Sequence, residues 1–314
     1  MVKRKVFVTG ASGRLGKYVV DLLIANDYEV IALSRHGNIE GCRTIIGDVF
    51  DFDYSQVKGC DFAVHLAAIT DMSRQYKDMY MVNVEGSKSV FERCAGAGVG
   101  HIIHMSSISV YGKKDNKNIT EDTPPMPDTH YARTKYAAEK IAMSYPGKVC
   151  ILRPSIIYGP GFNQGFYEAY RRIVDGNMFI VGDGKNHVPL VHARDVANAV
   201  VLSIAKRAEG VYNINNDDEM TQKELIEYVA SLVNIRKTKF MYLTKFIARP
   251  LLGMYNFYRM VRSKQPIPYE FVEMLSTDRI VKCDKARKIL GFENMVGLKE
   301  GIKEFVHYLA SLGN

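Results

Sequence analysis

The sequence of 314 residues contains no uninterrupted apolar run near the ~18 residues that a membrane-spanning helix needs. It also lacks an internal repeat and a low-complexity linker. Its five cysteines are scattered and form no CxxC pair, which disfavours a disulfide framework or a zinc site and fits a reducing cytoplasm. The basic start at residues 1–5 runs through Val6-Phe7-Val8 into Thr9-Gly10, which predicts a strand rather than a secretory signal.

Acidic residues are the scarcer charged group, since 42 Lys and Arg stand against 34 Asp and Glu and give a net charge of +8. A positive balance suits nucleic acid, anionic lipid or a phosphorylated ligand. The basic residues are mostly spread through the chain rather than gathered in a tail, which disfavours nucleic acid. The apolar share of 47 % is ample for a sizeable core, and the length predicts one large domain or two closely joined ones.

The first half of the chain alternates short β-branched runs with helical patterns. Strands are expected at 5–9, 29–33, 62–66, 101–105 and 149–152. Helices are expected at 15–26, 166–175, 221–233 and 305–312, the third opening with a Thr221/Glu224 capping box. This alternation predicts an α/β fold with a doubly wound, Rossmann-like parallel sheet that helices cover on both faces.

The first expected strand is joined to the first helix by Gly10-Ala11-Ser12-Gly13-Arg14-Leu15-Gly16, which has GxxGxxG spacing. Glycines there permit a tight turn and let backbone N–H groups approach a pyrophosphate, while the helix N-terminus adds a partial positive charge. The strand before the triplet and the helix after it strengthen this weak signal. The segment therefore predicts a dinucleotide site; the alternative is a glycine-rich turn that binds nothing.

No carboxylate ends the second expected strand, where dinucleotide-binding folds usually place one against the ribose 2′-hydroxyl. Ser34 and Arg35 stand there instead, and a hydroxyl with a guanidinium suits a 2′-phosphate. We therefore expect NADP to be preferred over NAD, with an ordinary surface arginine as the alternative. Asp48 and Val49 come later, ahead of the strand expected at 62–66; Asp48 either accepts from the adenine amino group or caps the next turn.

Tyr131 and Lys135 form a YxxxK pair, whose i, i+4 spacing places both side chains on one helix face. The ammonium is expected to lower the pKa of the tyrosine into a useful range for proton transfer. Upstream, Ser106 and Ser107 follow an expected strand, at the edge where open α/β sheets bind ligands. A serine there can hydrogen-bond a substrate oxygen as its charge changes. No histidine or cysteine cluster suggests a metal.

The order and spacing of these motifs resemble the extended short-chain dehydrogenase/reductases, the NAD(P)-dependent epimerase/dehydratase family. The matching segments are 9–16, 65–68, 83–86, 106–107, 131 with 135, 152–154, 158–160, 182–184, 191–197, 212–214, 285–286 and 290–292. The resemblance implies a Rossmann domain at 1–165, rejoined by about 186–213, and a smaller substrate-binding cap at 166–185 and 214–314. It also implies that a strand near 188–191 rejoins the large domain.

The resemblance implies that Tyr131 exchanges a proton with the carbinol oxygen, that Lys135 holds the nicotinamide ribose and that Ser107 bonds the substrate oxygen. Ser106 is expected to be a structural neighbour, and Asn83 to brace the sheet beside the cofactor. The residues expected to bind cofactor are Gly10, Ser12, Gly13, Arg14, Leu15, Gly16, Ser34, Arg35, Asp48, Val49, Leu66, Ala67, Ala68, Asn83, Tyr131, Lys135, Pro154 and Ser155. A homodimer that pairs through the YxxxK helix is also implied.

Two features of the nucleotide-sugar enzymes are missing. Ile156 stands where they typically carry asparagine and Val188 where they carry arginine, with His187 or Arg279 as substitutes. The run 275–279 ahead of 285–286 resembles the hydroxysteroid-dehydrogenase-like and dihydroflavonol-reductase-like branches. The predicted function is therefore NAD(P)-dependent hydride transfer to or from a secondary alcohol or ketone. The alternatives are a UDP-hexose 4-epimerase and a non-catalytic NADP-binding protein.

The segment 240–258 is rich in aromatic and aliphatic residues interleaved with Lys245, Arg249 and Arg259. It is interpreted first as core of the smaller domain, second as the wall of an apolar pocket and third as a contact with a membrane surface or a partner. Three histidines at or near strands are expected to be packed rather than catalytic: His65, His104 and His192.

Overall fold

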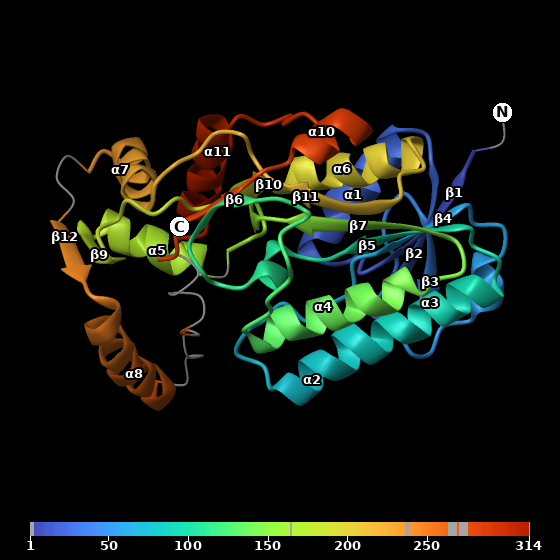
Figure 1. Ribbon diagram of the computed structural model, residues 1–314, viewed down its shortest axis with the longest axis horizontal. Coiled ribbons are helices and arrows are strands. Elements are labelled where there is room, and N and C mark those ends of the chain that lie inside the picture. Colours follow the sequence, from blue (N-terminus) through green and yellow to red (C-terminus); the bar gives the residue numbers. More distant parts are fainter. Residues whose placement is uncertain (1–2, 164, 236–238, 263–268, 270–275, 314) are drawn as a thin grey trace.

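The computed structural model describes residues 3–163, 165–235, 239–262, 269 and 276–313. Its largest sheet contains β1 (Lys5–Thr9), β2 (Glu29–Ser34), β3 (Arg43–Ile46), β4 (Phe62–His65), β5 (His101–Met105), β7 (Lys148–Pro154) and β11 (Gly210–Ile214). The strands are parallel and lie in the order β11-β7-β5-β4-β1-β2-β3 (Figure 1). The predicted doubly wound α/β fold is confirmed. The direction of winding reverses between β1 and β4, where such sheets bind ligands.

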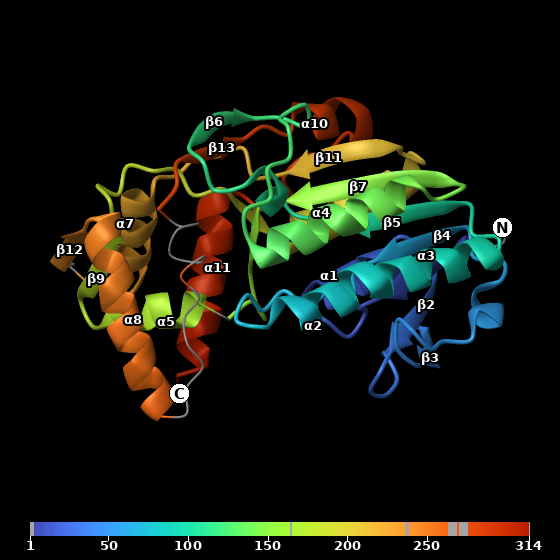
Figure 2. The ribbon, with the colours of Figure 1, turned by 60° about the horizontal axis from the view of Figure 1, so that its bottom comes forward.

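Helices cover both faces of this sheet, because its strands alternate apolar side chains between two cores (Figure 2). Val6 and Val8 of β1 enter one core and Phe7 enters the other. One face is covered by α1 (Arg14–Ala25), α6 (Ala193–Ala205) and α10 (Asp284–Leu290). The other is covered by α2 (Tyr76–Tyr80), α3 (Gly86–Gly96) and α4 (His130–Met143). A π-helical turn, Met81–Glu85, joins α2 to α3.

A smaller part of the chain has a core of its own. Its elements are α5 (Phe166–Val174), β9 (Asn177–Val181), α7 (Gln222–Leu232), β12 (Lys239–Leu243), α8 (Lys245–Val261) and α11 (Leu298–Ser311). The predicted Thr221/Glu224 capping box is present at the start of α7. The last helix begins earlier than the sequence predicts, at Leu298, because that residue and Ile302 continue its buried stripe. The domain boundary at residue 165 stays a prediction.

The strand expected near 188–191 is present, and Val191 packs in a core of the large sheet, but its strand partner lies outside that sheet. The structure has β10 (Leu190–His192) there, and it pairs with β8 (Ile156–Tyr158) in a separate two-stranded sheet. The reason is a change of partner after β7, since the N–H of Ser155 still bonds to β11 whereas that of Ile156 bonds to the residue before β10. The strand that returns to the large sheet is β11, which lies beside β7.

A second two-stranded pairing brings distant segments together. Strand β6 (Asn116–Ile119) follows β5 in the chain and pairs in parallel with β13 (Arg279–Val281) from near the C-terminus. This pairing carries Arg279 back to the loops at the carboxyl edge of the large sheet. Within the described ranges, no helix combines the length and the apolar character that crossing a bilayer needs.

Candidate active site

A cleft of about 460 Å³ lies where β1, β4, β5 and β7 end, a size typical of small-ligand sites. The expected site residues that line it are Gly10, Gly13, Arg14, Leu15, Gly16, Leu66, Ala68, Ser107, Tyr131, Lys135, Pro154 and Ser155. Those outside its lining are Ser12, Ser34, Arg35, Asp48, Val49, Ala67 and Asn83. Apolar side chains form much of the rest of the wall, among them Met72, Ile108, Ile156, Ile157, Phe162 and Phe166.

The glycine turn between β1 and α1 leaves no room for side chains. Gly10 has a φ of +71°, and a Cβ there would lie 2.7 Å from the backbone nitrogen of Ala67. A Cβ on Gly16 would collide with the carbonyl oxygens of Gly10 and Ala11. No side chain caps the N-terminus of α1, and its first turn holds no acidic residue. The turn therefore fits the pyrophosphate of a dinucleotide.

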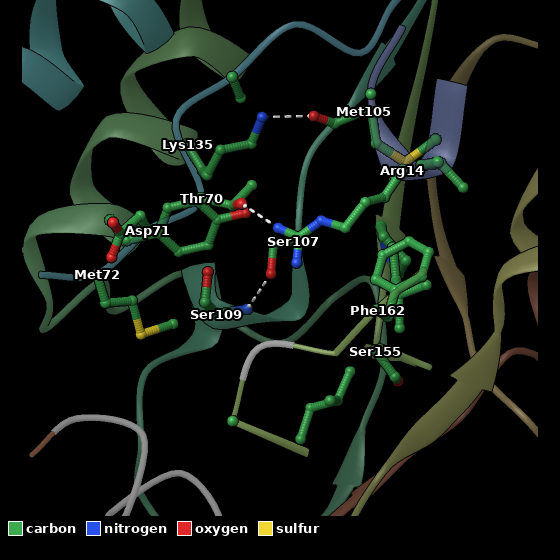
Figure 3. A pocket seen from close by; sticks show the side chains of 18 of the residues that line it. Arg14, Thr70, Asp71, Met72, Met105, Ser107, Ser109, Lys135, Ser155 and Phe162 are labelled. Carbon is green, nitrogen blue, oxygen red and sulfur yellow. Dashed lines mark hydrogen bonds between the residues drawn. The ribbon is translucent and has the colours of Figure 1, made fainter. Parts of the chain in front are cut away.

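Arg14, at the start of α1, crosses the cleft (Figure 3). Its guanidinium lies 5.4 Å from the ring centroid of Phe162 and donates to the hydroxyl of Thr70 at 3.3 Å. Both contacts come from loops that face each other across the glycine turn. The charge therefore sits beside the turn, where it would add to the attraction for a phosphate.

Asn83 holds the loop that follows β4. Its side-chain oxygen accepts from the N–H of Ile69 at 2.7 Å, and its amide donates to the carbonyl of Ile69 at 3.0 Å. The same amide donates to the hydroxyl of Thr134 on α4 at 3.0 Å. Because these bonds occupy the side chain, Asn83 positions Leu66 and Ala68 along the cleft rather than lining it.

Ser34 and Arg35 lie at the carboxyl end of β2. The hydroxyl of Ser34 is buried and lies 3.3 Å from both the backbone N and the backbone O of His36, so it shapes the turn after the strand. Arg35 is exposed. The pair therefore offers a 2′-phosphate one exposed guanidinium and one hydroxyl already engaged by the backbone.

Asp48 caps the turn after β3, as one of its two expected roles requires. Its Oδ1 accepts from the N–H of Phe50 at 2.7 Å, which leaves Oδ2 for an adenine amino group. Val49 is buried, and a Cβ on Gly86 of α3 would lie 2.8 Å from its methyl group. These contacts fix the loop after β3 against the helix layer.

Tyr131 and Lys135 lie one turn apart near the start of α4. Burial raises the pKa of Tyr131 to about 12, and its hydrogen bond to Ser107 acts in the opposite direction. Burial lowers the pKa of Lys135 to about 8, opposed by the negative charge of Glu139. Nζ of Lys135 donates to the carbonyl of Met105 at 2.5 Å (Figure 3). The expected lowering of the Tyr131 pKa by Lys135 is therefore wrong for this state, because burial dominates and the ammonium is held at the end of β5.

Ser107 follows β5 and caps the short helix Ile108–Tyr111. Its hydroxyl accepts from the N–H of Ser109 at 3.1 Å and is hydrogen-bonded with the phenol of Tyr131. The two groups thus face each other in the cleft. Ser106 donates instead to the buried carboxylate of Glu139, which is the structural position expected of it.

A buried ion pair lies beneath these residues and was missed from the sequence. Arg153 of β7 donates to both carboxylate oxygens of Glu139 of α4, at 2.9 and 2.6 Å. It also donates to the hydroxyl of Tyr111 at 2.8 Å, and Tyr111 donates to Asn213 of β11 at 2.8 Å. The network ties α4 to β7 and, through Tyr111, to β11. The signal was available, because Glu139 continues the face of Lys135 at i+4.

Arg279 presents a buried cation to the cleft. Its side chain is 2 % exposed, and only Nη1 has a partner, the carbonyl of Gly112 at 3.3 Å. Nε and Nη2 have none within the described chain. Burial lowers the pKa of Arg279 to about 10, opposed by Asp128, so it remains charged at neutral pH. Buried donors without partners are costly, and an anionic ligand group would satisfy them.

Ser155 and Ser109 also line the cleft with hydroxyls that are buried without a hydrogen-bond partner among the described residues. The two other positions considered for anion contact lie elsewhere. His187 bonds to Asp278 at 2.8 Å, and Val188 is buried in the core of the smaller part. Of the two expected substitutes for the missing arginine, only Arg279 lines the cleft.

The predicted packing of the three histidines agrees with their burial. Burial lowers the pKa of His65 to about 3 and that of His192 to about 4, so both are neutral. Burial also lowers the pKa of His104 well below its usual value. By contrast, the segment 240–258, interpreted first as core, exposes many of its apolar side chains, among them Phe246, Met254 and Phe257.

Comparison with known proteins agrees with this geometry. Residues 6–215 match the model of the NAD dependent epimerase/dehydratase family. The sterol-4-alpha-carboxylate 3-dehydrogenase, decarboxylating, of Mus musculus is 27 % identical over 96 % of this chain and 90 % of its own length. The 2-alkyl-3-oxoalkanoate reductase of Stenotrophomonas maltophilia is 25 % identical over 95 % of this chain and 97 % of its own. The structure of MoeE5 in complex with UDP-glucuronic acid and NAD has a TM-score of 0.78 and 25 % identity, and the match covers 98 % of this chain and 99 % of that one.

Proposed function

Because the chain belongs to the NAD-dependent epimerase/dehydratase family, we propose that it transfers a hydride between a nicotinamide cofactor and a secondary alcohol or ketone on an apolar substrate that carries an anionic group. One observation carries this proposal. The hydrogen-bonded pair of Ser107 and Tyr131 shares an apolar cleft with the incompletely paired guanidinium of Arg279.

The residues of the glycine turn would hold the cofactor pyrophosphate, with Lys135 at the nicotinamide ribose and Pro154 and Ser155 beside the nicotinamide. The fit rests on the space that only glycine allows at residues 10 and 16, on the uncapped start of α1 and on the unpartnered hydroxyl of Ser155. When bound, the nicotinamide supplies the hydride donor or acceptor.

Ser107 and Tyr131 handle the oxygen of the substrate. A carbonyl oxygen placed between their hydroxyls would accept a hydrogen bond from each, which stabilises the negative charge that develops on it. Tyr131 is protonated at neutral pH because its pKa is raised, so it can donate the proton that completes the alcohol. In the reverse direction, the deprotonated Tyr131 takes the alcohol proton as the carbon loses hydride.

Arg279 would select the substrate by its anionic group. The names of two relatives describe such compounds, a sterol 4-carboxylate and a 3-oxoalkanoate, and in each the carboxylate lies close to the carbon that is oxidised or reduced. The apolar walls of the cleft suit the remaining carbon skeleton. A 3-oxo or 3-hydroxy carboxylic acid on a greasy scaffold is therefore the substrate class that we propose.

The experiment compares 2-alkyl-3-oxoalkanoic acids with their methyl esters, following the loss of reduced cofactor. We expect kcat/KM to favour the acid by about 10- to 100-fold, because a hydrogen bond to a charged group contributes ~1.5–3 kcal/mol. Arg279→Met should remove this preference, whereas Arg133→Met, at an exposed arginine of α4, should keep it. Equal rates for acid and ester in the wild type would contradict the role of Arg279.

We propose NADP as the preferred cofactor, supported by the absence of a carboxylate after β2 and by exposed Arg35 at that point. Arg35→Asp should weaken NADP binding by about tenfold or more, since it removes a charge-assisted contact with the 2′-phosphate, and should leave NAD binding equal or stronger. Unchanged NADP affinity would make NAD the cofactor. Titration of both cofactors into both proteins decides between them.

A UDP-hexose 4-epimerase is the second candidate, supported by the likeness to a structure that contains UDP-glucuronic acid and NAD. Arg279 could pair with a diphosphate in that case, while Ile156 in the cleft and buried Val188 offer it no polar group. Calorimetric titration of UDP-hexoses into the cofactor-loaded protein distinguishes the candidates, because micromolar binding would favour the epimerase.

The assembly and the location of the protein are also proposals. A homodimer is supported by the family resemblance, with α4 as the pairing helix, and sedimentation velocity would test it. A cytoplasmic location rests on the scattered cysteines, which are free thiols in the structure.

A further inference from the structure

Helix α8 lies at the edge of the smaller part of the chain (Figure 1) and exposes apolar side chains. Its side chains of Phe246, Met254, Phe257 and Val261 are 90 %, 71 %, 71 % and 71 % exposed. Their spacing places them on one continuous side of the helix. Ile247, Leu251 and Tyr258 border this side and are also exposed, so we call these seven residues the α8 face. Contiguous apolar patches of this kind mark interaction surfaces.

The opposite side of α8 is anchored to the molecule. Ala248 is buried, and the ring of Tyr255 lies 5.1 Å from the guanidinium of Arg172 on α5. Arg259 is mostly buried and pairs with Glu168 of α5 at 3.9 Å. The helix is thus held in a fixed rotation by its inner side, and its outer side is not part of the core that the sequence suggested.

The net positive charge of the chain comes from the part of the sequence around this helix. Residues 228–269 contain eight Lys and Arg and no Asp or Glu, so the other 34 basic residues balance the 34 acidic ones. The basic residues are therefore mostly spread, as expected, and only their excess over the acidic residues is local. Arg262, at the end of α8, lies over the ring of Tyr258 at 4.7 Å, beside the α8 face.

An apolar face with Arg262 beside it, in a stretch of sequence that contains eight Lys and Arg and no acid, matches the surface of an anionic bilayer. A partner that covers this face would need a complementary apolar surface and acidic groups. A second copy that used the same segment 228–269 would supply no Asp or Glu. The 17 residues of α8 span only ~26 Å at 1.5 Å per residue, and a helix with one polar, anchored side lies along a membrane surface rather than through it.

We propose that α8 is an interfacial anchor that docks this protein on anionic lipid membranes through the α8 face, with Arg262 held at the headgroups. Arg259 lines the catalytic cleft from the inner side of the same helix. Docking would therefore bring the cleft next to the lipid. The surface itself does not depend on the proposed reaction.

The test is flotation of the full-length protein with vesicles of phosphatidylcholine alone or with added phosphatidylglycerol. We expect binding to the anionic vesicles to exceed binding to the neutral ones by about tenfold or more, and to weaken as salt screens the charges. Phe246→Asp/Met254→Asp/Phe257→Asp should lose the binding. The matched control Met126→Asp/Ile289→Asp/Met295→Asp replaces exposed apolar residues elsewhere and should keep it.

Circular dichroism and cofactor titration of each variant establish that the fold is intact. Failure of the wild type to float, equal binding to both vesicle types, or retained binding of the α8 variant would each overturn the proposal. So would a lipid-free dimer, seen by sedimentation velocity, that the α8 substitutions split into monomers, because a second copy would then cover the face. Loss of turnover without loss of flotation would count against the proposed function alone.

Discussion

Burial raises the pKa of the Tyr131 phenol, and the hydrogen bond to Ser107 lowers it. The effect of burial is the larger one. The sequence pattern located this residue but predicted the wrong direction for its pKa. A YxxxK spacing places two side chains on one face, yet it does not determine where the ammonium of Lys135 points. In the structure that ammonium bonds the carbonyl of Met105.

Lys135 gives the first prediction, since its lowered pKa of about 8 lies far below that of Tyr131. A lowered pKa means that the ammonium is present below pH 8 and lost above it. Ketone reduction should therefore fall as the pH rises through about 8, while Tyr131 stays protonated. Lys135→Met should lower the rate and remove this inflection from the pH profile of kcat.

Tyr131→Phe is the variant to compare with Lys135→Met. It should lose about 10²- to 10⁴-fold in turnover at every pH, because it removes the proton donor. Cofactor affinity should change little. An unchanged inflection in Lys135→Met, or near-normal turnover in Tyr131→Phe, would remove these residues from the mechanism.

At the scale of elements, the site depends on a buried clamp between α4 and β7. Glu139 and Arg153 are almost completely buried and form a two-pronged ion pair. The pair holds the helix that carries Tyr131 against the strand that ends at Pro154. The spacing places Glu139 on the same helix face as Lys135, but it does not identify Arg153 as the partner, because the two residues meet only once the helix is packed on the sheet.

Glu139→Ala should lower the free energy of unfolding by about 3–5 kcal/mol, because it leaves the charge of Arg153 buried without its partner. Glu209→Ala breaks an exposed pair with Lys148 and should change the free energy of unfolding little, because water screens exposed ion pairs. Denaturant unfolding of both variants measures the difference. Equal small losses would mean that the clamp contributes no more than a surface pair.

The glycine turn is the other element on which the account depends. Gly16→Ala should weaken cofactor binding by more than about tenfold, since its Cβ would push the Gly10 carbonyl into the space for the pyrophosphate. Gly100→Ala is the control, because a Cβ there meets no atom within 4 Å. Calorimetric titration of cofactor compares them, and equal affinities would place the dinucleotide elsewhere.

At the scale of the whole molecule, the sequence predicts the features that depend on neighbouring residues in the chain. Strand β1, the glycine turn and the Thr221 capping box are each encoded within a few residues, and the structure has all three. Arg279 was only one of two candidates for the anion, because its place in the cleft depends on the pairing of β13 with β6, far apart in the chain. The amphipathic spacing likewise predicts that α8 has an apolar side, but it does not predict whether the core, a membrane or a partner covers that side.

The central claim is net hydride transfer to a carbonyl carbon in this cleft. Its most direct measurement is incubation of the protein with deuterated reduced cofactor and a 2-alkyl-3-oxoalkanoic acid, followed by mass spectrometry of both. The account predicts one deuterium on the new carbinol carbon for each cofactor oxidised. Reduced cofactor that keeps its deuterium and is not consumed, while UDP-hexoses interconvert, would contradict it.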